Sequence, residues 1–149
     1  MNSCLGNGVL ALLGDKWSLI IIRDIMFTNR RHFEGLLSKS YEGIPSNILA
    51  NRLKKLVDLG MVVRAQDPTR KQKSVISLTE QSIQLLPIMV QIGSWGHKHC
   101  PASGEFRGRF RTIAHGGPTR QRAFMQELRR RHLEGVAERH FKVNLIGVQ

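Results

Sequence analysis

The strongest constraint on the fold is a run of leucines within residues 44–60 that recur at helical spacing. They are Leu49, Leu53, Leu56 and Leu59. Residues three or four positions apart lie on one face of an α-helix, so this pattern predicts a helix with a buried leucine stripe. Ser46, directly after Pro45, predicts the N-cap of this helix, and Gly60 predicts the C′ residue that ends it.

The other faces of the same helix are polar. They carry Asn47, Asn51, Lys54 and Lys55, and a strand-like run over residues 61–65 comes next. The major groove of DNA admits an α-helix and presents a distinct donor and acceptor pattern for each base pair. A short helix with an apolar back, a polar front and a strand directly after it is therefore typical of the DNA-reading helix of a winged-helix domain.

Further helices are expected before this one. They cover residues 5–13, residues from the cap Asp15 to about 28, and residues 33–38. A turn at residues 41–43 separates the last of them from the leucine-rich helix. This succession predicts a helix-turn-helix.

A β-hairpin is expected after Gly60. Residues 61–65 and 74–78 are β-like, and residues 66–73 between them are basic and contain Pro68. Proline cannot continue a β-ladder, so this middle segment is expected to be a loop. Strand, basic loop and strand together predict a wing.

The C-terminal half predicts more helices. Thr79 is expected to cap a long helix that runs to about Trp95, with a kink at Pro87. The apolar residues of this helix cover more than one face, which favours burial against a partner subunit. A last helix is expected from Pro118 to about His140.

We therefore predict a mainly α fold with a small β-hairpin wing, which is a winged helix-turn-helix with added dimerisation helices. The expected organisation is a DNA-binding and dimerisation domain over residues 4–97, a linker over 98–117 and a basic C-terminal helical extension over 118–149.

The charge of the chain favours a polyanionic partner. The 149 residues carry a net charge of +12, and residues 101–149 hold 10 Lys and Arg against 4 Asp and Glu. Such an excess favours nucleic acid ahead of an anionic membrane. No apolar run approaches the ~18 residues of a membrane span, and no signal peptide is visible. Since the chain has 2 cysteines and no disulfide framework, we expect a cytoplasmic protein that does not bind membranes.

Several short motifs occur in a fixed order along residues 4–96. They are Gly14-Asp15-Lys16-Trp17, Arg30-Arg31-His32-Phe33, residues 44–60, Pro68, Ser77-Leu78-Thr79-Glu80 and Trp95-Gly96. In this order and spacing they resemble an HxlR-type transcription regulator, a branch of the winged-helix proteins related to the MarR type. The resemblance implies a homodimeric, DNA-binding regulator. That family often has a Cys-Pro pair before its first helix, whereas Leu5 follows Cys4 here.

Three side chains of the leucine-rich helix are candidates for base contacts. Asn47 and Asn51 lie one turn apart, and an asparagine amide pairs well with adenine, although Asn47 is equally a solvated or capping amide. Arg52 is expected to pair with guanine or with a phosphate, or else to form a salt bridge with an acid such as Asp24 or Glu34.

The remaining candidates are expected to contact the phosphate backbone, since basic side chains and helix N-termini favour phosphate. They are Ser46, Lys54 and Lys55 on the leucine-rich helix, Arg30, Arg31 and His32 before the preceding helix, and Arg70, Lys71 and Lys73 in the wing. Each basic residue is alternatively a solvated surface residue.

Cysteine and histidine residues provide candidates for a switch. Cys4 is a candidate redox or electrophile sensor if a helix N-terminus favours its thiolate, or else an inert terminal cysteine. His97, His99 and Cys100 are too few for a tetrahedral zinc site, so no metal and no cofactor are predicted. No P-loop, G-x-S-x-G, H-E-x-x-H or C-x-x-C motif is present, which argues against an enzyme.

These observations predict a sequence-specific DNA-binding transcription regulator that acts as a homodimer on an inverted-repeat operator, under the control of a small effector or of a redox or electrophile signal. The alternative is a nonspecific nucleic-acid-binding basic protein. The amides of Asn47 and Asn51 argue against this alternative, because a packing protein needs only cations.

Overall fold

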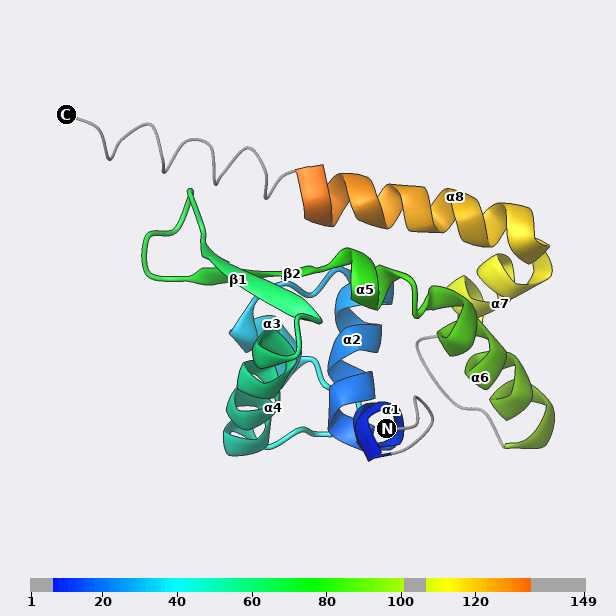
Figure 1. The fold of residues 1–149 in the computed structure, drawn as a ribbon, viewed down its shortest axis with the longest axis horizontal. Coiled ribbons are helices and arrows are strands. Elements are labelled where there is room, and N and C mark those ends of the chain that lie inside the picture. Colours follow the sequence, from blue (N-terminus) through cyan, green and yellow to red (C-terminus); the bar gives the residue numbers. More distant parts are fainter. Residues whose placement is uncertain (1–6, 101–106, 135–149) are drawn as a thin grey trace. The chain divides into compact units, whose positions relative to one another are not determined.

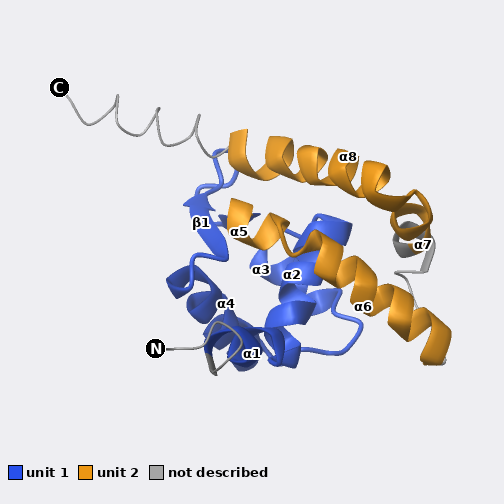
Figure 2. Cartoon of the chain, turned by 45° about the vertical axis from the view of Figure 1, so that its right-hand side comes forward, with its two compact units in different colours: residues 1–77 blue, residues 78–149 orange. Residues whose placement is uncertain are grey.

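A computed structural model describes residues 7–100 and 107–134 of the chain (Figure 1). The chain divides into two compact units, residues 1–77 and residues 78–149 (Figure 2). Unit 1 holds the predicted helix-turn-helix, and unit 2 holds the C-terminal helices.

Helices followed by a β-hairpin make up the described part of unit 1. The helices are α1 (Asn7–Leu13), α2 (Lys16–Thr28), α3 (Phe33–Ser38) and α4 (Ser46–Asp58), and the strands are β1 (Val62–Gln66) and β2 (Ser74–Leu78). The two strands pair in a two-stranded sheet. The predicted mainly α fold and the predicted wing are both confirmed.

Helix α2 begins at a polar cap and lies in the core of unit 1. The carboxylate of Asp15, the N-cap residue, accepts a hydrogen bond from the backbone N–H of Ser18 at 3.2 Å. The helix ends at Asn29, whose left-handed backbone (φ 54°) is a conformation that asparagine tolerates better than most residues. Between these ends, residues 20–22 and 24–27 are buried.

Helix α4 packs against α2 through its leucine stripe. Leu49, Leu53 and Leu56 are each 0% exposed. The prediction that Leu59 belongs to this stripe is wrong, since Leu59 is 46% exposed. Leu53, Leu56 and Leu59 are spaced three residues apart, which is less than the 3.6 residues of one turn, so each step shifts the side chain further around the helix. Leu59 is also the C-cap residue, beyond the last turn of α4.

The N-terminus of α4 differs from the prediction by one residue. Pro45 is the N-cap, with the extended backbone (φ −65°, ψ 146°) of that position, and Ser46 is the first helical residue. The prediction of Ser46 as the N-cap is therefore wrong. Proline fixes φ near this value, which suits the residue from which a chain enters a helix.

A glycine-based cap ends α4, as predicted. The N–H of Gly60 donates to the carbonyl of Val57 at 3.0 Å, and the N–H of Met61 donates to the carbonyl of Leu56 at 2.9 Å. These two bonds form a Schellman motif, which requires a left-handed residue at C′, and Gly60 has φ 70°. The motif reverses the chain directly into β1.

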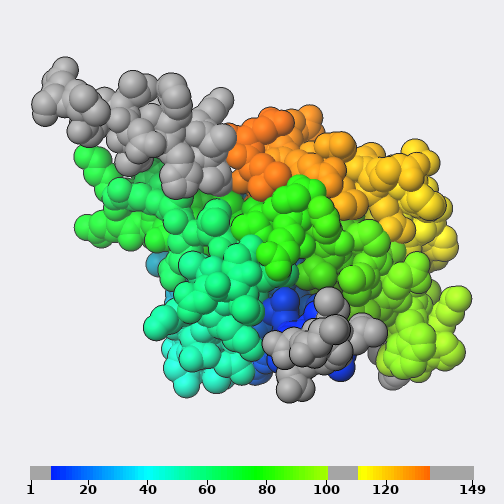
Figure 3. Space-filling view, viewed as in Figure 1, coloured from blue at the N-terminus to red at the C-terminus, as the bar shows by residue number. Residues whose placement is uncertain are grey.

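Unit 2 is mostly helical over its described residues. It contains α5 (Glu80–Ile83), α6 (Leu86–His99), α7 (Arg107–His115) and α8 (Gly117–Arg129), after which Arg130–Glu134 form one π-helical turn. The buried apolar residues of these helices are Ile83, Leu86, Met89, Val90, Ile113 and Leu128. Residues of α8 form a yellow to orange surface in the space-filling view (Figure 3).

The single kinked helix predicted after Thr79 is instead two helices, α5 and α6. Thr79 is the N-cap of α5, as predicted, and its N–H donates to the hydroxyl of Ser82 at 3.0 Å. Pro87 lies in the first turn of α6, where a helix does not need the N–H that proline lacks. The proline therefore begins a new helix rather than kinking an existing one.

Part of the segment predicted as a linker is helical, because Arg107–His115 form α7. Gly108 lowers the intrinsic helix propensity of this segment, but Ile113 is buried and α7 packs against α6 and α8. The last predicted helix forms as α8 and its π-helical turn, while residues 135–140 lie outside the described residues. The predicted domain boundaries stay predictions.

Within the ranges 7–100 and 107–134, no helix combines the length and the apolar character that crossing a bilayer requires.

We predict that Leu53→Ala lowers the free energy of unfolding by about 2–5 kcal/mol, because it opens a cavity between α4 and α2. Leu59→Ala is the matched control on the same segment and should change it by less than about 0.5 kcal/mol, since Leu59 is exposed. Urea unfolding of both variants measures the difference. Equal losses would contradict the assignment of the buried stripe.

Candidate nucleic-acid interface

The outward face of α4 is a polar stripe, which we define as Asn47, Asn51 and Lys54. These residues are exposed and follow one another at i, i+4 and i+7. At 3.6 residues per turn, this spacing places them on the side of α4 opposite Leu49, Leu53 and Leu56. The buried leucines therefore set the rotation of the helix and present the polar stripe to solvent. Ser46 is exposed in the first turn, and Lys55 is half-buried beside the stripe.

Arg52 is held inside unit 1 by an ion pair. Its Nε donates to Oδ2 of Asp15 at 2.8 Å, and its Nη1 donates to the amide oxygen of Asn51 at 2.7 Å. The ion pair that the sequence offered as an alternative for Arg52 is present, but its partner is Asp15 rather than Asp24 or Glu34. Arg52 thus joins α4 to the N-cap of α2 and orients the amide of Asn51.

The carboxylate of Asp15 accepts hydrogen bonds both from Ser18 of α2 and from Arg52 of α4. Burial alone would raise the pKa of Asp15, but the hydrogen bonds from Ser18 and Arg52 and the charge of Arg52 outweigh it, so the pKa lies below its ordinary value of 3.8. The carboxylate therefore stays charged at neutral pH. One acidic side chain caps α2 and fixes the position of α4.

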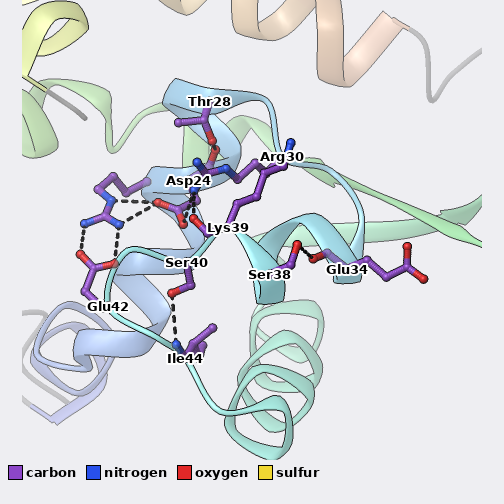
Figure 4. Close-up of polar contacts among 10 residues, drawn as sticks. Asp24, Thr28, Arg30, Glu34, Ser38, Lys39, Ser40, Glu42 and Ile44 are labelled. Carbon is purple, nitrogen blue, oxygen red and sulfur yellow. Dashed lines mark hydrogen bonds and ion pairs between the residues drawn. The ribbon is translucent and has the colours of Figure 1, made fainter. Parts of the chain in front are cut away.

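Arg30 is likewise bound inside unit 1 (Figure 4). Its Nη1 lies 3.4 Å from Oδ2 of Asp24 and donates to the carbonyl oxygen of Lys39 at 2.7 Å. Burial raises the pKa of Asp24 above its ordinary value, although Arg23 and Arg30 oppose this effect. Arg23 also bridges Asp24 to Glu42. These contacts tie α2 to the segment between α3 and α4.

Arg31 and the strand β2 are joined by reciprocal hydrogen bonds. The backbone N–H of Ile76 donates to the carbonyl oxygen of Arg31 at 2.7 Å. The guanidinium of Arg31 donates to the carbonyl of Ile76 at 3.2 Å and to the hydroxyl of Ser77. The turn before α3 is therefore attached to the wing.

His32 binds the base of the wing loop. Its Nε2 lies 2.9 Å from Oδ2 of Asp67, while Oδ1 of Asp67 accepts from the hydroxyl of Thr69 at 2.7 Å and from its N–H at 2.8 Å. The bond from Thr69, followed by that of His32, holds the pKa of Asp67 well below its ordinary value. These contacts order the start of the loop, before Arg70 and Lys71.

The tip of the wing is exposed and basic. Arg70 and Lys71 are exposed, and neither forms an ion pair with a described residue, whereas Lys73 pairs with Glu34 at 2.6 Å. Arg64 on β1 is also exposed and makes no ion pair within the described ranges. Sequence reasoning did not single out Arg64, although a lone charge in a β-like run indicates a residue on the solvent side of a strand.

The predicted contact residues thus fall into two groups. Facing outward or half-buried, with no ion pair among the described residues, are Ser46, Asn47, Asn51, Lys54, Lys55, Arg70 and Lys71. Bound within unit 1 through their side chains are Arg30, Arg31, His32, Arg52 and Lys73. The first group lies on α4 and the wing, which are the two elements that a winged helix directs at a duplex.

The predicted sensor residue, Cys4, lies outside the described residues. Cys100 is a free, exposed thiol at the end of α6. Over residues 7–100 and 107–134, no three side chains among His, Cys, Asp and Glu are arranged to hold a metal ion.

Helix α3, a turn and α4 followed by the hairpin of β1 and β2 define a winged helix-turn-helix protein. A sequence model of the HxlR-like helix-turn-helix family matches residues 12–104. The chain belongs to this family. The match ends before α7, so α7 and α8 lie beyond the family region.

Relatives and solved structures agree with this assignment. The HTH-type transcriptional regulator MT3179 of Mycobacterium tuberculosis is 34% identical over 92 residues, which cover 62% of this chain and 56% of that protein. The HTH-type transcriptional regulator YodB of Bacillus subtilis is 29% identical over 90 residues, which cover 60% of this chain and 79% of that protein. The chain therefore spans about half the length of the first of these relatives.

Similar folds occur in solved structures. The structure of PA1607 has a TM-score of 0.57 and 33% identity, and the match covers 68% of this chain and 71% of that one. The reduced form of the transcriptional regulator YodB from B. subtilis has a TM-score of 0.51 and 25% identity, and the match covers 64% of this chain and 91% of that one.

We predict that Asp15→Ala destabilises the protein by about 0.5–2 kcal/mol at pH 7, because it removes the N-cap of α2. The pKa of Asp15 is lowered in the folded state, so its contribution is present above about pH 4 and is lost as the pH falls through the folded pKa. Urea unfolding of wild type and variant at pH 7 and about pH 3 measures this difference.

The control for this variant is Asp58→Ala, which removes an exposed carboxylate that forms no ion pair with a described residue. It should change stability by less than about 0.5 kcal/mol. A loss for Asp15→Ala that stays constant with pH would contradict the role of its charge.

Proposed function

We propose that this protein is a sequence-specific DNA-binding transcription regulator that acts as a homodimer on an inverted-repeat operator. The observation that supports it best is the polar stripe of Asn47, Asn51 and Lys54, which is exposed on the side of α4 opposite three fully buried leucines. A helix fixed in this way can enter the major groove with its amides toward the base edges.

In this proposal the amides of α4 read bases. Asn51 already accepts a hydrogen bond from Arg52 on its amide oxygen. An amide oxygen has a second lone pair and the amide nitrogen has two N–H groups, so Asn51 retains both kinds of group that adenine pairs with. Arg52 therefore acts by orienting Asn51 rather than by reading guanine itself.

The cations of α4 and the wing that form no ion pair with a described residue contact phosphate. Lys54 and Lys55 lie on and beside the polar stripe, and Arg64, Arg70 and Lys71 lie on the wing. Phosphate contacts position a protein on the duplex without carrying sequence information. Arg30, Arg31 and His32, by contrast, hold the scaffold together through Asp24, β2 and Asp67, so we assign them a supporting role.

An apolar face on α6 supports the homodimer. Ile88, Ile92 and Trp95 follow one another at i, i+4 and i+7 and are 43%, 53% and 61% exposed. Large exposed apolar side chains aligned on one helix face favour an interface. Two recognition helices related by a dyad would meet half-sites about 34–36 Å apart.

Control by a small effector or a redox signal is a second part of the proposal. Its support is the likeness to YodB, which was solved in a reduced form. Comparing operator affinity of the reduced and oxidised protein tests the redox branch, and Cys4→Ser should abolish any difference. A difference that persists in Cys4→Ser would exclude Cys4 as the sensor.

The rival is a basic protein that coats nucleic acid without preference. Footprinting on genomic fragments selected by the protein at fixed, near-physiological salt separates the two. A protected inverted repeat supports the regulator, and uniform protection of all sequences supports the rival.

We predict that Asn51→Ala relaxes sequence preference by about 1–3 kcal/mol at one base pair of each half-site, because an amide contact to a base edge is lost. Lys71→Ala should instead weaken binding to operator and random duplexes alike, and it should reduce the salt dependence of the affinity by about 1 in slope. Binding titrations on both duplexes at several salt concentrations measure these effects.

Gln81→Ala, which removes an exposed amide on α5, is the control and should leave both affinities unchanged. If Asn51→Ala and Lys71→Ala each lower the affinity for operator and random duplexes by the same factor, the division between base and phosphate contacts is wrong.

The dimer interface predicts a separate outcome. Ile92→Glu places a charge in the apolar face of α6 and should convert a dimer into a monomer, because an interface cannot bury an unpaired carboxylate without a large cost. Size-exclusion chromatography with light scattering measures the mass. A wild-type protein that stays monomeric at tens of micromolar would refute the homodimer.

A further inference from the structure

Helices α7 and α8 and the π-helical turn after them carry a large share of the charge although they lie beyond the family region. Residues 107–134 contain 8 arginines and 2 glutamates, a net charge of +6 in a chain of net charge +12. The family match ends at residue 104. The function of a winged helix therefore does not by itself account for this charge.

Part of this charge is neutralised within unit 2. Arg129 donates to both carboxylate oxygens of Glu80, at 2.8 and 2.9 Å, and these hydrogen bonds raise the pKa of Arg129 and lower that of Glu80. Arg130 and Arg131 both pair with Glu127. These three arginines attach α8 to α5 or stabilise its last turn.

Another part of the charge is exposed. Arg111 on α7 and Arg120 and Arg122 on α8 are exposed and form no ion pair with any residue that the structure describes. We call these three residues the arginine surface. Unpaired cations on a protein surface attract external anions.

The arrangement favours an extended anion over a small one. Arg120 and Arg122 are two residues apart, so they point to opposite flanks of α8 and do not converge on a single phosphate ion. Leu128 buries the inner side of α8, and in the π-helical turn after it Nδ1 of His132 accepts a hydrogen bond from the N–H of Leu78 at 3.1 Å. Helix α8 therefore presents Arg120 and Arg122 on two separate flanks.

The same helix lacks what binding of single strands requires. Single-stranded nucleic acid is held by exposed aromatic side chains on which bases stack. The aromatic side chain of α8 is Phe124, which is half-buried. A duplex, whose charge is spaced along a regular backbone, fits the arginine surface better.

We propose that the arginine surface is a second, sequence-independent contact to the phosphate backbone of duplex DNA. The inference deepens the proposed function and rests on it. Each arginine neutralises a phosphate and releases a condensed counterion, so the surface adds affinity that depends on salt but not on sequence.

The test uses the full chain and two matched triple variants. Arg111→Gln/Arg120→Gln/Arg122→Gln removes the charges, and Arg111→Lys/Arg120→Lys/Arg122→Lys keeps them. Affinities for an operator duplex and for a random duplex of equal length are measured between about 50 and 200 mM salt. Thermal unfolding checks that both variants fold. If the triple glutamine variant does not fold, Arg122→Gln alone replaces it in the test.

For the triple glutamine variant we expect the salt slope to become shallower by about 2–3, at about 0.9 for each phosphate contact. The affinity should fall about 10–100-fold at near-physiological salt, by the same factor on both duplexes. The triple lysine variant should keep the wild-type slope. Arg122→Gln alone should make the slope shallower by about 0.9.

Other results would overturn the inference. If the wild type prefers its operator and the triple glutamine variant keeps both affinity and slope, the arginine surface does not contact DNA, while the proposed function stands. A loss in the lysine variant as large as that in the glutamine variant excludes a charge effect. If the triple glutamine variant binds anionic vesicles or single-stranded RNA more weakly than the wild type but binds duplex DNA equally well, the partner of the arginine surface is not duplex DNA. A wild type that binds no duplex refutes the proposed function as well.

Discussion

Burial of Leu49, Leu53 and Leu56 against α2 is the interaction on which the candidate interface depends. These leucines fix the rotation of α4 about its own axis. Because a helix has two opposite faces, fixing one determines what the other presents, and here the opposite face is Asn47, Asn51 and Lys54. A leucine-to-alanine change in this stripe would therefore disturb the outward side chains without touching them.

Ion pairs then decide which basic residues of unit 1 are available to a partner. Arg30 and Arg52 occur in basic stretches of sequence, yet each is bound to an aspartate. Arg30 pairs with Asp24, which lies within α2, and Arg52 pairs with Asp15, the N-cap of α2. Partly buried pairs of this kind orient the elements that they join, because each charge must remain close to its partner. The exposed cations of α4 and the wing lack such partners among the described residues, which is what a surface for phosphate requires.

Unit 2 repeats this division. Arg129 binds Glu80 and attaches α8 to α5, whereas Arg111, Arg120 and Arg122 are exposed. A cluster of arginines that appears uniform in sequence therefore has two roles. Those near an acid support the helical packing, and we propose that those facing solvent provide a long-range attraction to a polyanion.

Local physics let the sequence alone determine a leucine-rich helix that ends at Gly60, the Asp15 cap and the wing. Periodicity, side-chain capping and a glycine with positive φ act within a few residues, so they are visible in a short window. Tertiary structure decided the rest. The partner of Arg52 lies 37 residues away and that of His32 lies 35 residues away, distances over which no sequence pattern specifies a contact. Packing against α6 and α8 likewise made a helix of α7, whose composition predicted a linker.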